Sequence, residues 1–380
     1  FTGFDPADNI QMTDIWPSPS AADLSADPEA RRPATGGKPQ PLHVINLALN
    51  LVSGKNLAWQ QRKAASFTVT PLHCGNKDLG YRALFTDDPA QQFRPKRLYG
   101  GQKEGISLGT AVTISGAAAS PNMGYHSSGV VTFIMALFNA RLGWWLGNPS
   151  LKGKNTFYKS GPELAIKPLL AETFGLTDDQ NPYVYLSDGG HFENLGLYEM
   201  VLRRCRLIVV SDAGCDPAFG FQDLGNAIRK VRIDLGVEIE MGDMRMWPRS
   251  DGRLFAKDGH PGRYCAIGRI KYPAGESVET GTLIYLKPGV YGGEPLDVLN
   301  YASRNPAFPH EPTSDQWFSE AQFESYRALG AHVVEQIFGA DDLAPMTADV
   351  VERARRYADG METDSSSQPQ VAIDRHGAAR

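Results

Sequence analysis

A strand-helix-strand pattern at residues 183–211 constrains the fold more than any other part of the 380-residue sequence. The apolar run Y-V-Y-L at 183–186 predicts a strand, and a helical pattern covers 195–205. The β-branched run L-I-V-V-S at 207–211 is typical of a strand buried on both faces. Two strands joined through a helix form a parallel pair with a right-handed crossover. We therefore predict a β-α-β unit in an α/β sheet, with its site at the carboxyl end of the first strand.

Asp188 stands at that carboxyl end and is followed by Gly189 and Gly190. The two glycines let the backbone turn sharply and leave room for a partner or a substrate beside the carboxylate. An isolated D-G-G is usually only a turn, because Asp and Gly are common turn formers. Here a helix and a second strand follow the turn, so Asp188 is a candidate for a buried base that serves a nucleophile.

Periodicity predicts the other elements of the chain. A hairpin is expected from strands at 42–52 and 66–71, because the turn residues S-G-K-N follow the first of them. A helix of small residues is expected at 107–120, where the side chains allow close backbone approach. The remaining expected elements are helices at 163–174 and 221–235, strands at 237–241, 266–272 and 282–287, and a packing helix at 314–338 with an Asp in its first turn.

Composition divides the chain into three parts. Residues 1–41 are rich in Pro, Asp, Ala and Ser without periodicity, so we expect a linker or an extended segment. Residues 42–345 carry the elements described above and are expected to form one domain. Residues 346–380 are expected to hold the end of a helix and a disordered tail, because a serine run and scattered charge dominate their last part.

Overall composition narrows the classes of partner. Hydrophobic residues make up 42% of the chain and charged residues 21%, which is the composition of a globular protein. The formal net charge of -5 shows no excess of Lys and Arg, which argues against nucleic acid as a partner. The four cysteines form no C-x-x-C pair, so they indicate neither a zinc cluster nor a disulfide framework and fit a reducing compartment.

The longest apolar window lies at 129–147, where Asn139 and Arg141 interrupt the run of about 18 apolar residues that would cross a bilayer. We interpret this window as a buried helix. The alternative is a membrane-facing helix anchored by its two tryptophans. The first residues contain neither the basic nor the apolar region of a signal peptide, so none is expected.

The stretch 183–217, with its D-G-G loop, the following Asn and the second strand ending in S-D-A, resembles the patatin and cytosolic phospholipase A superfamily. A second stretch, A-V-T-I-S-G-A-A-A-S-P at 111–121, is similar to the A-T-S-A-A-P-type helix that patatins place before this loop. The two motifs occur in the order of the family, and the resemblance covers residues 42–216.

The resemblance implies a three-layer α/β/α sheet and a lipid acyl hydrolase that uses a Ser-Asp dyad with Asp188 as its base. It also implies an active-site loop with Gly189, Gly190, His191 and Asn194, and a structural serine at Ser115. The run L-G-L-Y at 195–198 departs from the family, in which many relatives have Pro soon after the Asn. A lipid ester as substrate, a membrane surface as partner, a place on the cytoplasmic side, and no cofactor or metal are the other implications.

The sequence lacks a nucleophile elbow. That motif, G-x-S-x-G, needs glycines because its serine sits on a strained strand-to-helix turn. Ser115 has Thr113 and Ala117 at the flanking positions instead, and no glycine-rich oxyanion loop precedes Asp188. We therefore expect the serine on polypeptide upstream of Phe1, an incomplete patatin-like sheet in this chain, and no activity of the chain alone.

Three alternatives stay open. Ser115 could be the nucleophile of a self-sufficient domain, although a β-branched Thr113 fits the elbow poorly. A non-catalytic module could bind lipid membranes through residues 129–147. A metal-dependent hydrolase could use carboxylate and imidazole ligands, although the H-x-E spacing is too short to place both side chains on one helical face. Its candidate ligands are Asp188, His191, Glu193, Asp212 and Asp216. His126 is expected only to form a hydrogen bond near the site.

Overall fold

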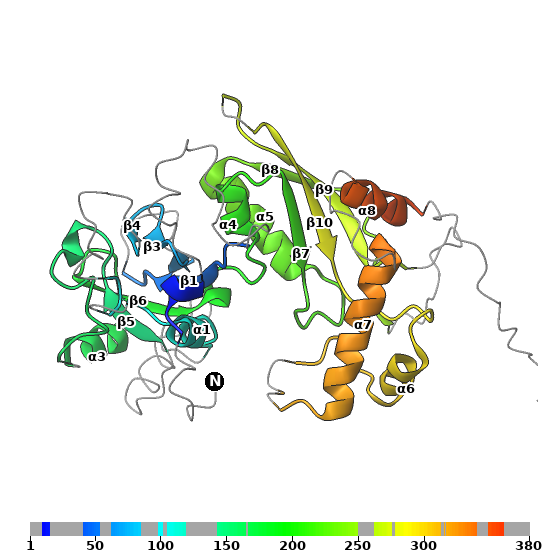
Figure 1. Cartoon of the computed structure of the whole chain (residues 1–380), viewed down its shortest axis with the longest axis horizontal. Helices are drawn as coiled ribbons and strands as arrows, with labels where there is room; N and C mark the ends of the chain where they lie inside the picture. Colours follow the sequence, from blue (N-terminus) through cyan, green and yellow to red (C-terminus); the bar gives the residue numbers. More distant parts are fainter. Residues whose placement is uncertain are drawn as a thin grey trace, which may run out of the picture. The chain divides into compact units, whose positions relative to one another are not determined.

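The computed structural model of the protein describes residues 10–15, 41–53, 62–84, 98–101, 105–118, 143–164, 166–249, 262–275, 278–312, 315, 317–339 and 349–360. The chain divides into two compact units, Phe1–Glu199 and Met200–Arg380. Each unit has its own sheet, and the described elements mix helices and strands (Figure 1). The structure therefore confirms a mixed α/β chain, and the boundary between the units lies inside the segment 42–345.

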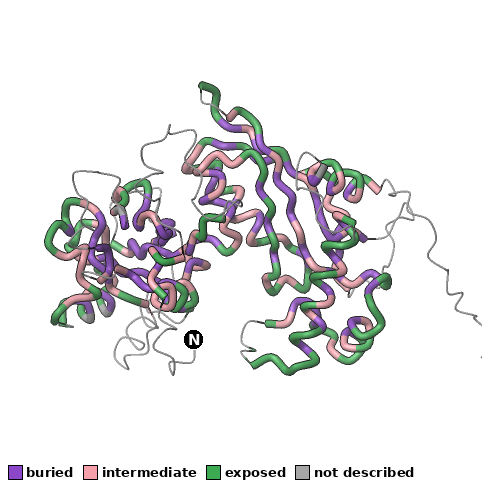
Figure 2. The backbone as a smooth tube through the Cα atoms, in the orientation of Figure 1, coloured by how far each residue is buried: buried purple, intermediate pink, exposed green. Residues whose placement is uncertain are grey.

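The first unit is built on a six-stranded sheet in which every pair of neighbours is antiparallel. In sheet order the strands are β4 (Gly80–Ala83), β3 (His73–Asn76), β2 (Ala64–Val69), β1 (Ile45–Asn50), β6 (Tyr183–Asp188) and β5 (Trp144–Gly147). The predicted hairpin is confirmed, because β1 and β2 pair in register from Ile45 opposite Val69 to Asn50 opposite Ala64. The central strands are the most buried part of this unit (Figure 2).

The first unit also contains helices. α1 (Leu108–Ser115) begins at Ser107, whose side chain accepts a hydrogen bond from the backbone N–H of Thr110, and its buried residues Ala111 and Ile114 belong to the core of the unit. The helix predicted at 107–120 is thus confirmed over 108–115, and it ends before residues 116–118. α3 (Ile166–Thr173) confirms the helix predicted at 163–174. The shorter elements of this unit are η2 (Met12–Ile15), η8 (Leu151–Gly153) and η9 (Gly189–His191), and the boundary between the two units falls inside α4 (Leu197–Leu202).

The second unit holds a four-stranded sheet with the order β7 (Leu207–Ser211), β10 (Thr280–Leu286), β9 (Cys265–Lys271) and β8 (Glu238–Met241). β7 runs parallel to β10, and the other pairs are antiparallel. These strands were all predicted, and their side chains alternate between two faces. Ile284 and Cys265 face a core that is shared with the helices α6 (Leu296–Arg304), α7 (Glu320–Phe338) and α8 (Asp349–Asp359). Tyr285 contacts Phe221, which precedes α5 (Gln222–Leu235).

The predicted helix at 314–338 forms, but its start was placed too early. α7 begins at Glu320 with a capping box, in which Ser319 and Gln322 each bond the other's backbone N–H. Asp315 therefore lies before the helix and not in its first turn. A helix begins where its free N–H groups find acceptors, and Ser319 supplies one here.

The predicted parallel pair of β6 and β7 is wrong. β6 lies between β1 and β5 in the first sheet, whereas β7 pairs with β10 in the second. The run 207–211 is also not buried on both faces, because Leu207 and Val209 are 41% and 45% exposed while Ile208 and Val210 are buried. Hydrophobicity in a short segment predicts a strand but does not choose its neighbours, which depend on segments far away in the sequence.

The window 129–147 lies outside the described residues up to position 142. Its last residues, Trp144–Gly147, form strand β5, so the predicted helix does not extend to Gly147. A helix with the length and hydropathy needed to span a bilayer is not found in the described part of the chain. His126 and the tail after residue 360 also lie outside the described residues.

Candidate functional site

Asp188 is the last residue of β6 and the first residue of a tight turn. Its Oδ1 atom accepts a hydrogen bond of 2.7 Å from the backbone N–H of Gly190, which caps η9. Its Oδ2 atom has no hydrogen-bond partner among the described residues. The side chain is half-buried. One oxygen therefore orients the carboxylate, while the other is free to accept a proton.

The Asp188 carboxylate lines a cavity of about 570 Å³ in the first unit. Three segments form its wall: residues 43–46 at the start of β1, the end of α1 with Ser115, and the loop 188–196. Four of the predicted loop residues therefore lie together at this cavity, namely Asp188, Gly189, Gly190 and Asn194. The volume lies within the usual range for small-molecule sites.

The two glycines after Asp188 are required by close packing. A Cβ atom on Gly189 would lie 2.6 Å from the carbonyl oxygen of Asn46, and one on Gly190 would collide with the side-chain amide of Asn194. Neither residue needs a positive φ angle. The loop can thus lie against β1 only because these positions carry no side chain.

A series of hydrogen bonds holds the loop after β6 in place, and it was not predicted from the sequence. The Asn50 amide donates to the Ser187 Oγ atom over 2.9 Å, and Ser187 lies 2.8 Å from Nδ1 of His191. The other ring nitrogen of His191, Nε2, lies 3.2 Å from the Ala118 carbonyl oxygen. Because a carbonyl only accepts, Nε2 carries the proton and Nδ1 accepts from the Ser187 hydroxyl. Asn50, polar within an apolar strand, was the signal in the sequence.

Ser115 does not have the geometry of a nucleophile elbow. It is the last residue of α1, and its hydroxyl donates to the carbonyl oxygen of Asn46 over 2.8 Å. An elbow serine instead follows a strand and precedes a helix, where the N-terminal N–H groups help to stabilise the oxyanion. The position of Ser115 is that of a residue that packs α1 against β1.

The residues proposed as metal ligands are not gathered into one cluster. Both carboxylate oxygens of Glu193 accept backbone hydrogen bonds, from Leu195 over 2.5 Å and from Tyr198 over 3.2 Å, at the start of α4. Asp212 and Asp216 belong to the second unit. In the described ranges, three or more His, Cys, Asp or Glu side chains nowhere come together in an arrangement that could hold a metal ion.

Comparison with known proteins provides no relative for this chain. No family model, curated protein or solved structure matches it. Function is therefore inferred from the described residues themselves. Two groups of polar residues are candidates for a functional site: those around Asp188 and a second cluster around Lys287.

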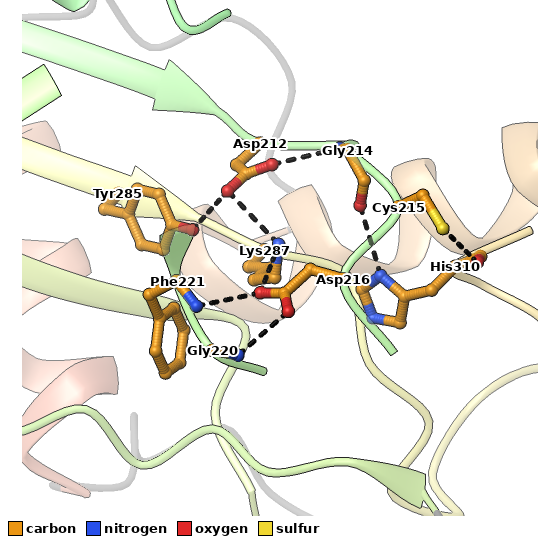
Figure 3. A network of polar contacts seen from close by, with 9 residues as sticks. All are labelled: Asp212, Gly214, Cys215, Asp216, Gly220, Phe221, Tyr285, Lys287 and His310. Carbon is orange, nitrogen blue, oxygen red and sulfur yellow. Dashed lines mark hydrogen bonds and ion pairs between the residues drawn. The ribbon is translucent and has the colours of Figure 1, made fainter. Parts of the chain in front are cut away.

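That second cluster surrounds Lys287, which follows β10 and is only 1% exposed (Figure 3). Its ammonium lies 3.1 Å from Asp212 and 3.4 Å from Asp216. Asp212 also accepts hydrogen bonds from the Tyr285 hydroxyl and from the backbone N–H of Gly214. The two carboxylates neutralise the buried ammonium and fasten the loop after β7.

Asp216 is held in the charged form. Burial by itself raises the pKa of its carboxyl, but hydrogen bonds from the N–H groups of Gly220 and Phe221, together with the charge of Lys287, lower the pKa overall. All four carboxylate oxygens of the cluster have partners within the second unit. This saturation indicates a structural centre and leaves the Asp188 cavity as the better candidate for chemistry.

His310 packs beside the same loop and makes the second unit sensitive to pH. Its Nδ1 atom lies 3.3 Å from the Gly214 carbonyl oxygen, and burial lowers its pKa below 6.5. The unfolded chain then binds a proton that the folded unit does not bind. Stability is therefore complete above about pH 6.5 and is lost as the pH falls through the unfolded pKa.

We expect urea unfolding to show a lower stability at about pH 5.5 than at about pH 7.5, with a smaller difference in His310→Asn. His332 has a pKa lowered by burial in the same way, so His332→Asn should also reduce the difference. His43 is exposed, and His43→Asn serves as the control. An unchanged pH dependence in both buried-histidine variants would contradict this assignment.

Proposed function

We propose that the protein is a patatin-type lipid acyl hydrolase in which Asp188 is the base of a Ser-Asp dyad and the serine comes from polypeptide outside these 380 residues. The observation that supports it most is the carboxylate oxygen of Asp188 that has no described partner and belongs to a side chain lining a cavity of about 570 Å³. The resemblance of residues 111–121 and 183–217 to the family motifs points the same way.

The mechanism assigns one role to each part of the site. A serine hydroxyl attacks the carbonyl carbon of the lipid ester, and Oδ2 of Asp188 takes its proton. The alcohol then leaves with a proton from the same carboxyl group. The acyl group stays on the serine oxygen as an acyl-enzyme. Water then attacks the acyl-enzyme as Asp188 accepts its proton. The fatty acid is released when the bond to the serine oxygen breaks and Asp188 returns the proton to that oxygen. The bond from Gly190 keeps the carboxylate oriented throughout.

We extend this proposal to the complete fold of the enzyme and to its place in the cell. Strands supplied with the nucleophile would complete a three-layer α/β/α arrangement, and the enzyme would act on lipid at the cytoplasmic side of a membrane. The non-catalytic alternative is favoured by one observation, the missing elbow in the sequence. It predicts lipid binding by the whole gene product without hydrolysis.

Labelling with a fluorophosphonate probe separates these possibilities. The probe reacts with activated serines, so we expect it to label the protein as its gene encodes it, on a serine outside residues 1–380. Ser115→Ala should keep the label, because the Ser115 hydroxyl is bonded to a backbone carbonyl. Loss of the label in Ser115→Ala would move the nucleophile to α1, and a gene product that never reacts would contradict the proposed hydrolase.

A further inference from the structure

We propose that the outer edge of β7 pairs with the same strand of a second copy of the chain, so that two four-stranded sheets become one. β7 is the last strand of its sheet and has a neighbour, β10, on one side only (Figure 1). The outer side of an edge strand carries backbone N–H and C=O groups that another strand can bond.

Three residues of β7 turn their backbone groups away from β10. The backbone carbonyl oxygen of Arg206 accepts a hydrogen bond from Thr282, and the backbone N–H of Asp212 donates one to Leu286. Successive residues of a strand point these groups to opposite sides, so every second residue between Arg206 and Asp212 also bonds β10. The outward groups have no hydrogen-bond partner among the described residues and belong to Leu207, Val209 and Ser211.

The opposite edge of the same sheet is protected by charge. Glu238 and Glu240 of β8 have exposed side chains, and each forms an ion pair with Lys271. Charged side chains on an edge strand discourage pairing with another chain. β7 has the sequence L-I-V-V-S, without a charge, a proline or a glycine, and Leu207 and Val209 are 41% and 45% exposed. Of these two edges, β7 is therefore the one that suits a further strand.

Charge at the two ends of β7 favours a second copy as that strand. Arginines precede the strand and aspartates follow it, namely Arg203, Arg204 and Arg206, then Asp212, Asp216 and Asp223. The start keeps a charge of +2 when Glu279, before β10, is counted with the arginines, and the end keeps -2 when Lys287 is counted with the aspartates. A twofold axis pairs the two strands antiparallel, so the positive start of each lies beside the negative end of the other.

The position of the outward groups sets the register of the pair. With the axis at the central residue, Val209 lies opposite Val209 of the second copy, and Leu207 lies opposite Ser211. Each of these residues then donates one hydrogen bond and accepts one, so all outward groups are matched. The half-exposed Val209 side chains also meet at the axis, and Arg206 of each copy lies opposite Asp212 of the other.

The pairing of β7 is independent of the proposed hydrolase. β7 belongs to the second unit, whereas the residues that line the Asp188 cavity belong to the first. Self-association is also measured without a substrate. Failure of one proposal therefore leaves the other unaffected.

Sedimentation equilibrium of the 380-residue chain tests the association. We expect a mass that rises with concentration from that of one chain to that of two. Val209→Lys should weaken the association about tenfold or more, because it places two ammonium groups opposite each other at the twofold axis. The matched control is Val334→Lys on α7, where the parent valine is 48% exposed, and it should associate like the parent chain. Circular dichroism should show that both variants are folded.

Disulfide formation tests the register. The Cα atoms of a hydrogen-bonded antiparallel pair lie about 5.5 Å apart, which is a distance that a disulfide bridges. Val209→Cys should therefore form a cross-linked dimer on mild oxidation, in a Cys215→Ser background that removes an exposed thiol. Leu207→Cys in the same background should not cross-link, because the two Leu207 positions lie four residues apart along the pair, about 14 Å.

The mass of a single chain at every concentration would overturn the proposal, as would equal association of Val209→Lys and the parent chain. Cross-linking of Leu207→Cys without cross-linking of Val209→Cys would overturn the twofold register. A dimer of the 380-residue chain together with a monomer of the protein as its gene encodes it would also overturn the proposal. In that case, a strand from elsewhere in the same gene product occupies the edge of β7.

Discussion

Replacing Asp188 by asparagine in the protein as its gene encodes it is expected to lower the rate of ester hydrolysis by about 10²–10⁴-fold, the usual contribution of a general base. An amide has nearly the shape of the carboxylate but does not accept the serine proton. The bond from Gly190 can be kept through the amide oxygen, so the loop should retain its conformation. Initial rates on a short-chain ester and on phospholipid vesicles would measure the effect.

Asp179→Asn is the matched control for this experiment. Asp179 lies in the same unit, outside the Asp188 cavity, and its carboxylate bonds the adjacent Gln180 side chain. We expect hydrolysis at the rate of the parent protein. The fluorophosphonate label should also become weaker in Asp188→Asn, because the serine would no longer lose its proton to a base. Hydrolysis that is undiminished in Asp188→Asn would remove the carboxylate from the mechanism.

Replacing Lys287 by methionine is expected to reduce the free energy of unfolding of the second unit by about 3–5 kcal/mol, the usual effect of removing one partner of a buried ion pair. Methionine fills a similar volume but leaves Asp212 and Asp216 without their cation. Asp212 is only 3% exposed, so solvent does not replace the lost charge. Urea unfolding would measure the loss, and hydrogen exchange in β10 would assign it to this unit.

Lys271→Met provides the comparison at the surface of the same sheet. Lys271 is 40% exposed and pairs with Glu240 over 2.5 Å. Solvent and salt screen such a pair, so its loss should cost much less than the loss of Lys287. The double variant Asp212→Asn, Lys287→Met should be less destabilised than the sum of its single changes, because the two groups interact directly. Equal losses for Lys287→Met and Lys271→Met would contradict the structural role of the buried centre.

Much of the local structure was predictable from sequence. The hairpin of β1 and β2, the helices α1, α3, α5 and α7, and all four strands of the second unit follow patterns of period 2 or 3.6. The placement of Asp188 at a strand end was also predicted, because β6 is a short apolar run that ends in D-G-G. These features depend on neighbours along the chain, and a short window of sequence contains them.

The hydrogen bonds behind the site were not predictable in this way. Asn50 and Ser187 are 137 positions apart, and nothing in either local sequence pairs them. Ile166 and Leu170 on α3 show the same limit, because their spacing is that of an ordinary buried face although they are 68% and 48% exposed. Which side of a helix is covered depends on what packs against it, here the bond between Glu172 and Trp145.

The sequence by itself determined where most of the strands and helices named above form, though not the start of α7 or strand β5, and it placed Asp188 with its two glycines at the end of a strand. Tertiary structure decided that β6 and β7 lie in separate sheets, that the Asp188 loop lies against β1 and the end of α1, and that Lys287 is buried between two aspartates. The physical reason is the distance along the chain over which each kind of interaction acts. Backbone conformation and side-chain periodicity act over a few residues, whereas strand pairing and the burial of charge depend on groups that only folding brings together.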